Sequence, residues 1–480
     1  MAYIGKSPVI GNFVKLDAIT AVNGQAAYTM QNGGSNFTDY ESVNQFLVSL
    51  NGTIQAPTDS FTVSGSTLTF ASNLSTGDVI DFIMVFGNSL SAGTPTDATV
   101  TTAKLADSAV TAAKITDATI TSAKIASGVI QNQSAFKNIV INGDMSIAQR
   151  ATSTASITGN GYHTIDRYKT VISSAGTWTQ SQSTTVPSGQ GFATSLKMDC
   201  TTADASLSAS DKLYIEQNIE GQFLQYLKKG TSSAESVTLS FWVRSNKTGT
   251  YIAAIKDNDN SRYISKSYTI SAADTWEKKT ITFAGDTTGT LGNDNATSFR
   301  LNFWLAAGSN FTSGTLATDW ESETDANKAV GQVNLADSTS NEWYITGVQL
   351  EAGTSASDFE FLPHDINRQR CLRYYYKYNE DGSNNAVGVS HGLNTGEIFC
   401  DFYYPQKMRS TPSFSISSSG NFSVQTGAQE ITCNSFTTER NNRTNIILKF
   451  GVTGSSGIGQ GTCATLLGGG SSRLIAEAEL

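Results

Sequence analysis

Carboxylates are densest between residues 319 and 325, where Asp319, Glu321, Glu323 and Asp325 stand at alternate positions. Two carboxylates can hydrolyse a glycosidic bond when they are held roughly 5–10 Å apart across a sugar. A polar surface loop supplies such groups without fixing their separation. The sequence therefore favours a charged surface loop here over a catalytic pair.

A Gly-x-Ser-x-Gly sequence occupies residues 388–392, with Ser390 at its centre. In serine hydrolases this sequence forms a strand–turn–helix elbow, and a histidine follows later in the chain. The histidines here are His163, His364 and His391, and only His391, the neighbour of Ser390, lies downstream. We therefore predict a β turn that its glycines make easy to form, without catalytic function.

Two other stretches have the residue types of ligand sites. Asp257 and Asp259 have the spacing of a calcium loop, but the sixth position lacks glycine and the twelfth is Tyr268. We predict a solvated hairpin loop. The glycine-rich residues 454–461 open no helix and miss the dinucleotide-binding spacing, so they are also predicted to be a loop.

Charge and composition exclude several classes of protein. The 480-residue chain has a formal net charge of −9 and no basic block, which opposes binding to nucleic acid. Its five cysteines form no metal-binding pair and are expected to be reduced thiols. The first residues lack the apolar core of a signal peptide. The most apolar run, 79–86, is too short to span a membrane and contains Asp81.

Residues 1–90 are predicted to form a small β unit. Asn51-Gly52 lies between apolar runs, which is a strong hairpin signal. Gly65-Ser66 lies between two alternating segments and predicts a second hairpin.

Residues 91–134 contain a ten-residue sequence motif that is repeated three times. Its large apolar residues fall five apart, which fits neither a helix period of about 3.6 nor a strand period of 2. One large apolar residue in every five can be buried only if repeats stack against one another. Copies of the same chain packed around a common axis would bury these residues. We predict a trimeric shaft; a flexible linker is the alternative. The proposed shaft core is Val100, Leu105, Val110, Ile115, Ile120 and Ile125.

Residues 135–363 contain strand-like runs at regular spacing, including 237–245, 249–257, 298–308 and 341–353. Apolar residues alternate in these runs, as at Leu239, Phe241 and Val243 and again at Leu301, Phe303 and Leu305. Such a pattern predicts a two-sheet sandwich of jelly-roll type. Further strand-like segments follow in 364–480, and the last is at 474–476.

Several motifs resemble those of phage tail fibres, in particular fibres of short-tailed and marine phages. The opening of a carbohydrate-binding-like domain is similar to Asn142-Gly143, Gln149-Arg150 and Asp166-Arg167-Tyr168. Residues 239–245 resemble the central strand of that domain, and residues 343–363 resemble its last one. Residues 369–378 and the final "AEAEL" are similar to a C-terminal fibre tip. Residues 46–83 resemble a virion-attachment domain, and the repeat is also common in such fibres.

This resemblance implies an all-β, elongated homotrimeric fibre of four parts. They are a virion-attachment domain (1–90), the repeat shaft (91–134), a jelly-roll carbohydrate-binding-like domain (135–363) and a receptor-binding tip (364–480). The expected partners are a phage tail or adaptor protein at the N-terminal end and a host-surface glycan at the C-terminal end. The protein would be assembled in the host cytoplasm, become part of the virion and recognise its receptor without being an enzyme.

The resemblance also suggests candidate site residues. In similar sandwiches the first and last strands often share a structural calcium, for which the candidates here are Asn142, Asp144 and Glu351; no other cofactor is expected. Sugar rings stack on exposed aromatic side chains. Trp320, in a polar loop, and Tyr403 and Tyr404, before Pro405, are therefore candidate receptor-binding residues; packing is the alternative.

Two other functions remain open at this point. One is a depolymerising tailspike that hydrolyses host glycan, although the sequence lacks the coil repeat of a parallel β-helix. The other is a secreted bacterial carbohydrate-binding protein, which the missing signal peptide and the shaft repeat disfavour.

Overall fold

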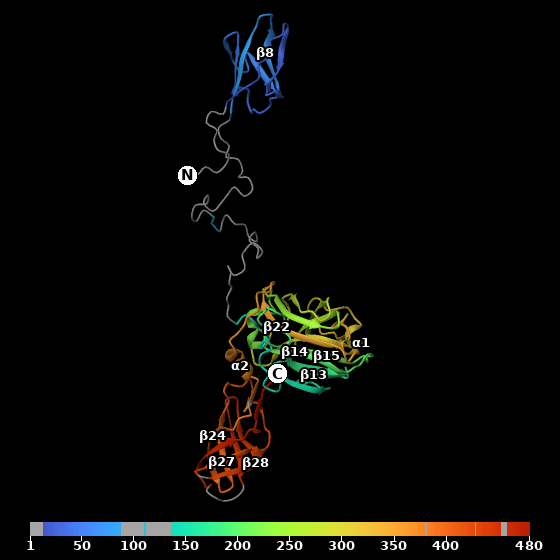
Figure 1. Ribbon diagram of the computed structural model, residues 1–480, viewed down its shortest axis with the longest axis vertical. Coiled ribbons are helices and arrows are strands. Elements are labelled where there is room, and N and C mark those ends of the chain that lie inside the picture. The colour runs from blue at the N-terminus through green and yellow to red at the C-terminus, as the bar shows by residue number, and fades with distance from the viewer. Residues whose placement is uncertain (1–12, 88–109, 112–135, 380–381, 428, 453–457) are drawn as a thin grey trace. The chain divides into compact units, whose positions relative to one another are not determined.

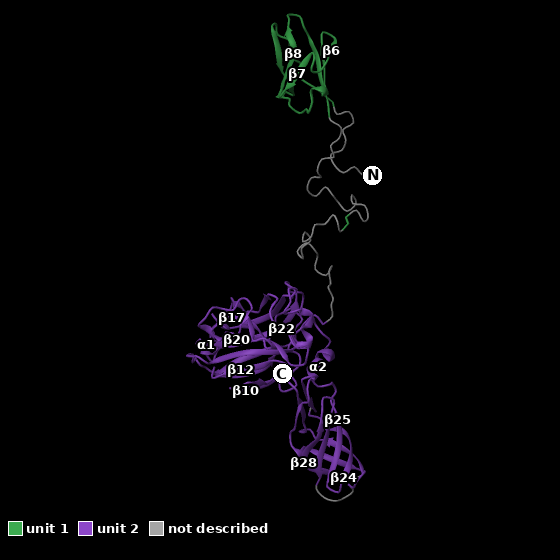
Figure 2. Ribbon diagram, turned by 180° about the vertical axis from the view of Figure 1, so that it is seen from behind, with its two compact units in different colours: residues 1–132 green, residues 133–480 purple. Residues whose placement is uncertain are grey.

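The computed structural model describes residues 13–87, 110–111, 136–379, 382–427, 429–452 and 458–480. The chain divides into two compact units, residues 1–132 and 133–480 (Figure 2). The predicted sandwich and tip thus belong to the same unit. Of the predicted shaft core only Val110 is described, and its side chain is 55% exposed in the single chain. The remaining five positions, Val100, Leu105, Ile115, Ile120 and Ile125, lie outside the described residues.

The first unit is built from short antiparallel strands around one apolar core (Figure 1). Both predicted hairpins are confirmed. Asn51 and Gly52, both with positive φ, connect β5 to β6, and Gly65-Ser66 connects β7 to β8. The strands are β1 (Phe13–Lys15), β2 (Gln25–Thr29), β3 (Gln31–Asn32), β4 (Ser35–Asn36), β5 (Phe46–Leu50), β6 (Thr53–Gln55), β7 (Phe61–Ser64), β8 (Thr67–Leu74) and β9 (Ile80–Phe86).

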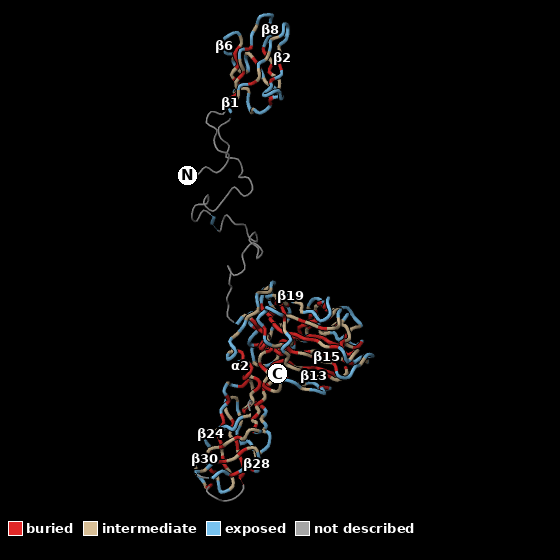
Figure 3. Tube along the Cα trace, viewed as in Figure 1, coloured by how far each residue is buried: buried red, intermediate tan, exposed pale blue. Residues whose placement is uncertain are grey.

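Residues 136–362 form the predicted sandwich of two antiparallel sheets, with one large apolar core. The buried residues along its strands are red in Figure 3. The six-stranded sheet has the order β10-β13-β14-β22-β16-β19. Its strands are β10 (Ser153–Ile157), β13 (Thr177–Ser183), β14 (Ser195–Thr202), β16 (Val237–Ser245), β19 (Glu277–Phe283) and β22 (Glu342–Ala352).

The seven-stranded sheet has the order β11-β12-β15-β20-β17-β18-β21. Its strands are β11 (Gly161–Tyr162), β12 (Lys169–Ser173), β15 (Lys212–Glu220), β17 (Gly249–Asp257), β18 (Arg262–Ile270), β20 (Thr297–Ala307) and β21 (Glu321–Ser322). A four-residue helix, α1 (Ser309–Thr312), opens the long segment that leads from β20 towards β22.

The alternation read from the sequence decides which side chains enter this core. Leu239, Phe241 and Val243 of β16 are fully buried between the sheets, as predicted. Leu301, Phe303 and Leu305 of β20 are equally buried. Because successive strand residues point to opposite faces, their neighbours on β20 lie on the outer face of the seven-stranded sheet, the face turned away from the six-stranded sheet.

Residues 364–480 begin with a helix, α2 (His364–Leu372), and continue as a three-stranded sheet, β23-β31-β26, and a closed six-stranded barrel, β24-β25-β29-β28-β27-β30. An apolar cluster fills the barrel. The strands are β23 (Tyr375–Tyr378), β24 (Asn385–Asn394), β25 (Glu397–Tyr403), β26 (Ser413–Ile416), β27 (Phe422–Thr426), β28 (Gln429–Asn441), β29 (Asn445–Val452), β30 (Cys463–Gly468) and β31 (Leu474–Glu477).

Two sequence-based predictions need correction. The residues around Ser390 lie within β24 and not in a turn, and the Ser390 hydroxyl donates a hydrogen bond to the Ala464 carbonyl at 3.1 Å. Asp257 does lie at the β17–β18 hairpin, but it is fully buried and pairs with the Lys229 ammonium at 2.6 Å. The hairpin was predicted correctly, and Asn258 and Asp259 are exposed as expected. The prediction is wrong for Asp257 alone, because its ion-pair partner comes from residue 229, far away in the sequence.

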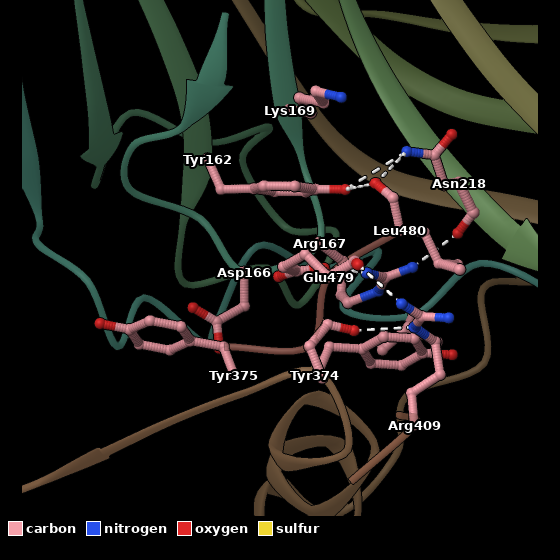
Figure 4. Close-up of polar contacts among 12 residues, drawn as sticks. Tyr162, Asp166, Arg167, Lys169, Asn218, Tyr374, Tyr375, Arg409, Glu479 and Leu480 are labelled. Carbon is pink, nitrogen blue, oxygen red and sulfur yellow. Dashed lines mark hydrogen bonds and ion pairs between the residues drawn. The ribbon is translucent and has the colours of Figure 1, made fainter. Parts of the chain in front are cut away.

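Buried charges connect the sandwich to the segment that follows β31 (Figure 4). The Arg167 guanidinium, 1% exposed, pairs with the Glu479 carboxylate and donates to the Asn218 carbonyl at 2.6 Å. Its guanidinium carbon also lies 3.5 Å from the centre of the Tyr374 ring. Arg150 pairs with Glu479 at 3.2 Å. We call this set of contacts the junction.

Further contacts extend the junction. Arg373, directly after α2, pairs with the buried Glu220 of β15 at 2.7 Å. Arg409 donates to the carbonyls of Asn295 and Glu479, both at 2.9 Å. The junction therefore holds strand ends of the sandwich, the helix α2 region and the β31 segment together by side-chain contacts.

Asp166 lies within the junction and makes its stability depend on pH. Burial raises the pKa of Asp166 from 3.8 to about 7, against the opposing effects of the Arg150 charge and the hydrogen bonds from Gln149. The folded state therefore binds a proton that the unfolded state releases, and this stabilisation is complete below pH 3.8 and lost as pH rises through about 7. The loss amounts to at most roughly 1.4 kcal/mol per pH unit.

We expect Asp166→Asn to remove this dependence, since asparagine stays neutral throughout. The measurement is the midpoint of thermal unfolding for both proteins at several pH values between about 4 and 8. The difference between them should change with pH in that interval. Parallel curves would mean that Asp166 titrates at its ordinary pKa.

Candidate functional site

The outer face of the seven-stranded sheet carries polar and aromatic side chains in register. Tyr214 of β15 lies opposite Trp304 of β20, and Glu216 lies opposite Asn302. In the next row Arg300 lies opposite Lys256 of β17. Cross-strand partners on one face are close neighbours, so the sheet itself brings these groups together.

These side chains line a pocket with a volume of about 210 Å³. The sheet forms its floor, and the segment after β20 forms one wall with Phe311, Glu323 and Lys328. The complete lining is Lys212, Tyr214, Glu216, Lys256, Tyr263, Arg300, Asn302, Trp304, Phe311, Glu323 and Lys328.

Several buried acceptors on this floor have no hydrogen-bond partner among the described residues. Glu216 is 1% exposed, and neither of its carboxylate oxygens accepts a hydrogen bond. Its nearest cations are distant: Lys169 at 4.0 Å and Arg300 at 3.9 Å. Asn302 Oδ1 is also buried without a partner. Buried polar groups are normally satisfied, so a group of unsatisfied acceptors in one pocket indicates a place for donors from a ligand.

The second carboxylate of the pocket, Glu323, is fully paired. It contacts the Lys256 ammonium at 2.7 Å and the Lys328 ammonium at 2.5 Å. Burial alone would raise the pKa of Glu323, but the hydrogen bonds from the two lysines outweigh burial and leave the pKa below its ordinary value. Glu323 therefore stays ionised and is unsuited to be the proton donor of a glycosidase. The prediction of a loop that does not hold its carboxylates is wrong for this residue.

Aromatic side chains fix the shape of the floor. The Tyr214 and Trp304 rings are 4.7 Å apart between centroids, and Trp304 Nε1 donates to the Tyr263 hydroxyl at 3.1 Å. Burial raises the pKa of both tyrosines, and for Tyr214 the charge of Glu216 adds to the rise. Both hydroxyls thus remain neutral. Tyr214 is only half-buried, so part of its ring is open to a ligand.

This arrangement fits a small ligand rich in hydroxyl groups. Hydroxyls can donate to Glu216 and Asn302, and the volume is below the range of roughly 300–1,000 Å³ of pockets for drug-sized molecules. A metal ion fits less well, because Lys169 and Arg300 flank Glu216 with positive charge. Within the described part of the chain, no cluster of three or more His, Cys, Asp or Glu side chains could hold a metal ion.

The aromatic residues predicted from the sequence lie outside this pocket. Trp320 is half-buried: its ring stacks on Phe299 with 6.0 Å between centroids, and its Nε1 donates to the Ala284 carbonyl at 2.7 Å. Trp320 therefore has packing partners that its polar sequence neighbours did not reveal. Tyr404 is 7% exposed and its hydroxyl donates to Asn441, whereas Tyr403, at the end of β25, is 69% exposed. Of the three candidates, Tyr403 is the most exposed, Trp320 is partly accessible and Tyr404 is buried.

The three calcium candidates are held by hydrogen bonds within the protein. Asn142 bonds the backbone of Ile147, and Asp144 accepts from Asn367 at 2.9 Å. Glu351 accepts from Gln349 and from the backbone and side chain of Ser357. Among the described residues, no hydrogen bond links Glu351 to the other two candidates, so the arrangement gives the proposed calcium no support.

Apart from Glu323, the pocket residues were not identified from the sequence, although the two-residue spacing of outward strand residues was present. In β20 the inward series was recognised, but Arg300, Asn302 and Trp304 alternate with it on the outer face. In β15 the series Lys212, Tyr214, Glu216 has the same two-residue spacing and was not recognised as a strand.

The comparisons with known proteins return structures but no sequence family. No family model matches the chain, and no curated protein matches it. Among solved structures, the enzymatically active domain of tailspike protein 4 from bacteriophage CBA120 is similar at 16% identity and a TM-score of 0.24, over 45% of this chain and 21% of that one. The chain thus spans about a fifth of the length of that domain.

Two further solved structures are matched over nearly their whole length. A putative sugar-binding protein from Bacteroides thetaiotaomicron has 13% identity and a TM-score of 0.25, over 45% of this chain and 99% of that one. A family 11 carbohydrate-binding module from Clostridium thermocellum has 13% identity and a TM-score of 0.21, over 42% and 98%. Because these TM-scores are low, we infer the ligand from the pocket itself.

No helix among the described residues is both long and apolar enough to cross a membrane.

Proposed function

We propose that this chain is a phage tail fibre that binds a glycan on the host surface through the pocket on the outer face of the seven-stranded sheet. The observation that carries the proposal is Glu216, a buried carboxylate beside Asn302 Oδ1. Among the described residues none of these acceptor oxygens receives a hydrogen bond, and the cations nearest to Glu216 lie at 3.9 and 4.0 Å. Such a floor suits a ligand that supplies several hydroxyl donors at once. The order of the sequence motifs supports the fibre, with residues 1–90 attached to the virion.

The proposed mode of action is binding without hydrolysis. Glu323, one of the two carboxylates in the pocket, is kept ionised by Lys256 and Lys328 and would be a poor general acid. Three copies per fibre would bind a repeating glycan with an avidity far above that of one pocket. The thin apolar stripe of the repeat supports the trimer.

The test is to incubate the full chain with polysaccharide purified from the host surface. We expect the protein to co-sediment with the polysaccharide and the polysaccharide to keep its length in size-exclusion chromatography. Shortened chains would instead indicate a depolymerase, and no co-sedimentation with any surface glycan would refute the proposal. Light scattering of the same sample should give three times the mass of one chain, and a monomer would refute the trimer.

A further inference from the structure

The pocket carries positive charge in a protein that is otherwise acidic. Four cationic side chains and two carboxylates line it, whereas the whole chain has a formal net charge of −9. Two of the cations, Lys256 and Lys328, are paired with Glu323. The other two, Lys212 and Arg300, therefore determine the charge that a ligand meets.

Lys212 has no carboxylate partner among the described residues: its ammonium lies 5.4 Å from the centre of the Phe311 ring and forms no ion pair there. Arg300 approaches Glu216 only at 3.9 Å, and its Nε is buried without an acceptor. The Arg300 Nε is as informative as an unpartnered acceptor, since a buried N–H that is not satisfied by the protein needs an acceptor from elsewhere. Lys212 is half-buried and contributes a positive charge to the pocket.

Three successive outward residues of β15 present three different chemical groups in a row. Lys212 supplies a cation, Tyr214 part of an aromatic ring, and Glu216 two hydrogen-bond acceptors. Alternate residues of a strand are roughly 6–7 Å apart, which is about the width of a sugar ring. A ring lying over Tyr214 would thus have one edge towards Glu216 and the other towards Lys212.

We propose, on the basis of the function proposed above, that the pocket selects a saccharide unit bearing a carboxylate, as in a uronic acid. Its hydroxyl groups donate to Glu216 and Asn302, and its carboxylate faces the Lys212 ammonium. Arg300 offers a further donor beside Glu216. A neutral sugar would satisfy the acceptors of the floor but leave the ammonium of Lys212 without a counter-charge.

The experiment compares acidic polysaccharides with their own neutral forms. Polygalacturonate, alginate and hyaluronan fragments are each bound to the full chain by calorimetry before and after chemical reduction of the carboxyl groups to primary alcohols. We expect at least one acidic form to bind and its reduced form to bind at least about tenfold more weakly. The preference should shrink as salt is raised, because salt screens a partly exposed charge pair.

The matched variants are Lys212→Met in the pocket and Lys278→Met, an exposed lysine of β19 on the other sheet. Lys212→Met should lower affinity for the acidic form about three- to tenfold and leave the reduced form unchanged, while Lys278→Met should change neither. If acidic and reduced forms bind equally, the inference fails and glycan binding stands. If the chain binds host polysaccharide but none of these acids, the inference is also overturned; if it binds no glycan at all, the proposed function fails with it.

Discussion

Replacing Arg167 by methionine is expected to destabilise the second unit by about 3–5 kcal/mol, the usual cost of removing one partner from a buried ion pair. Arg167 is 1% exposed, and the carboxylate it leaves behind, on Glu479, is 6% exposed. The variant also loses the hydrogen bond to the Asn218 carbonyl and the contact with the Tyr374 ring. Arg150 remains within 3.2 Å of Glu479 and limits the loss.

The positions of the tryptophans allow the unfolding of the sandwich to be followed separately from that of residues 364–480. All six tryptophans lie between residues 178 and 343, within the sandwich, and none lies in 364–480. Tryptophan fluorescence therefore follows the sandwich alone, whereas far-ultraviolet circular dichroism follows all strands. We expect one common transition at residues 133–480 in the wild type and separate transitions in Arg167→Met, with the barrel region unfolding at its own midpoint.

The control is Lys228→Met, because the Lys228–Glu235 pair is exposed at 54% and 45%. Exposed pairs contribute about 0–1 kcal/mol, so this variant should unfold like the wild type. Equal midpoints for Arg167→Met and Lys228→Met would mean that the junction does not couple the two parts.

Replacing Glu216 by glutamine is expected to weaken glycan binding about 10- to 100-fold without lowering stability. Hydrogen bonds to charged groups contribute about 1.5–3 kcal/mol, and the substitution removes the charge while keeping the shape. In the free protein neither oxygen of Glu216 accepts a hydrogen bond from any described residue. A neutral amide at this position should therefore leave the unfolding midpoint equal to or above that of the wild type.

This combination separates a binding role from a structural one. A structural Glu216 would lower the unfolding midpoint on substitution, and binding would fall only as a secondary effect. Glu235→Gln, on an exposed residue outside the pocket, is the matched control and should alter neither property. Unchanged affinity of Glu216→Gln for a glycan that the wild type binds would place the binding site elsewhere.

The strands of the sandwich could be predicted closely because their signal is local. Residues 237–245 and 249–257 were predicted as strands from their strand-like runs and the turn residues between them, and β16 and β17 have these bounds. The hairpins at Asn51-Gly52 and Gly65-Ser66 were equally predictable, since the turn residues and the flanking strands lie together in the sequence.

The pocket and the junction could not be predicted in this way because their members meet only through the sheet order. Glu216 and Asn302 are neighbours only because β15 pairs with β20. The motifs Gln149-Arg150 and Asp166-Arg167 were recognised as marks of resemblance, and their physical role became visible only with Glu479 beside them. The packing partners of Trp320 could not be predicted for the same reason, since Phe299 and Ala284 lie outside its loop.

The closure of the six-stranded barrel has a consequence for how the protein behaves at high local concentration. Each of its strands pairs with two neighbours, although the pairing is staggered: in β28, Gln429–Thr432 pair with β27 and Cys433–Asn441 pair with β29. The closed barrel therefore presents fewer free backbone N–H and C=O groups than the open edge of a sheet would. Open edges are the usual template for intermolecular strand addition and fibrillar aggregation. We therefore expect this part of the chain to resist self-association through its backbone even when many copies are crowded on one surface.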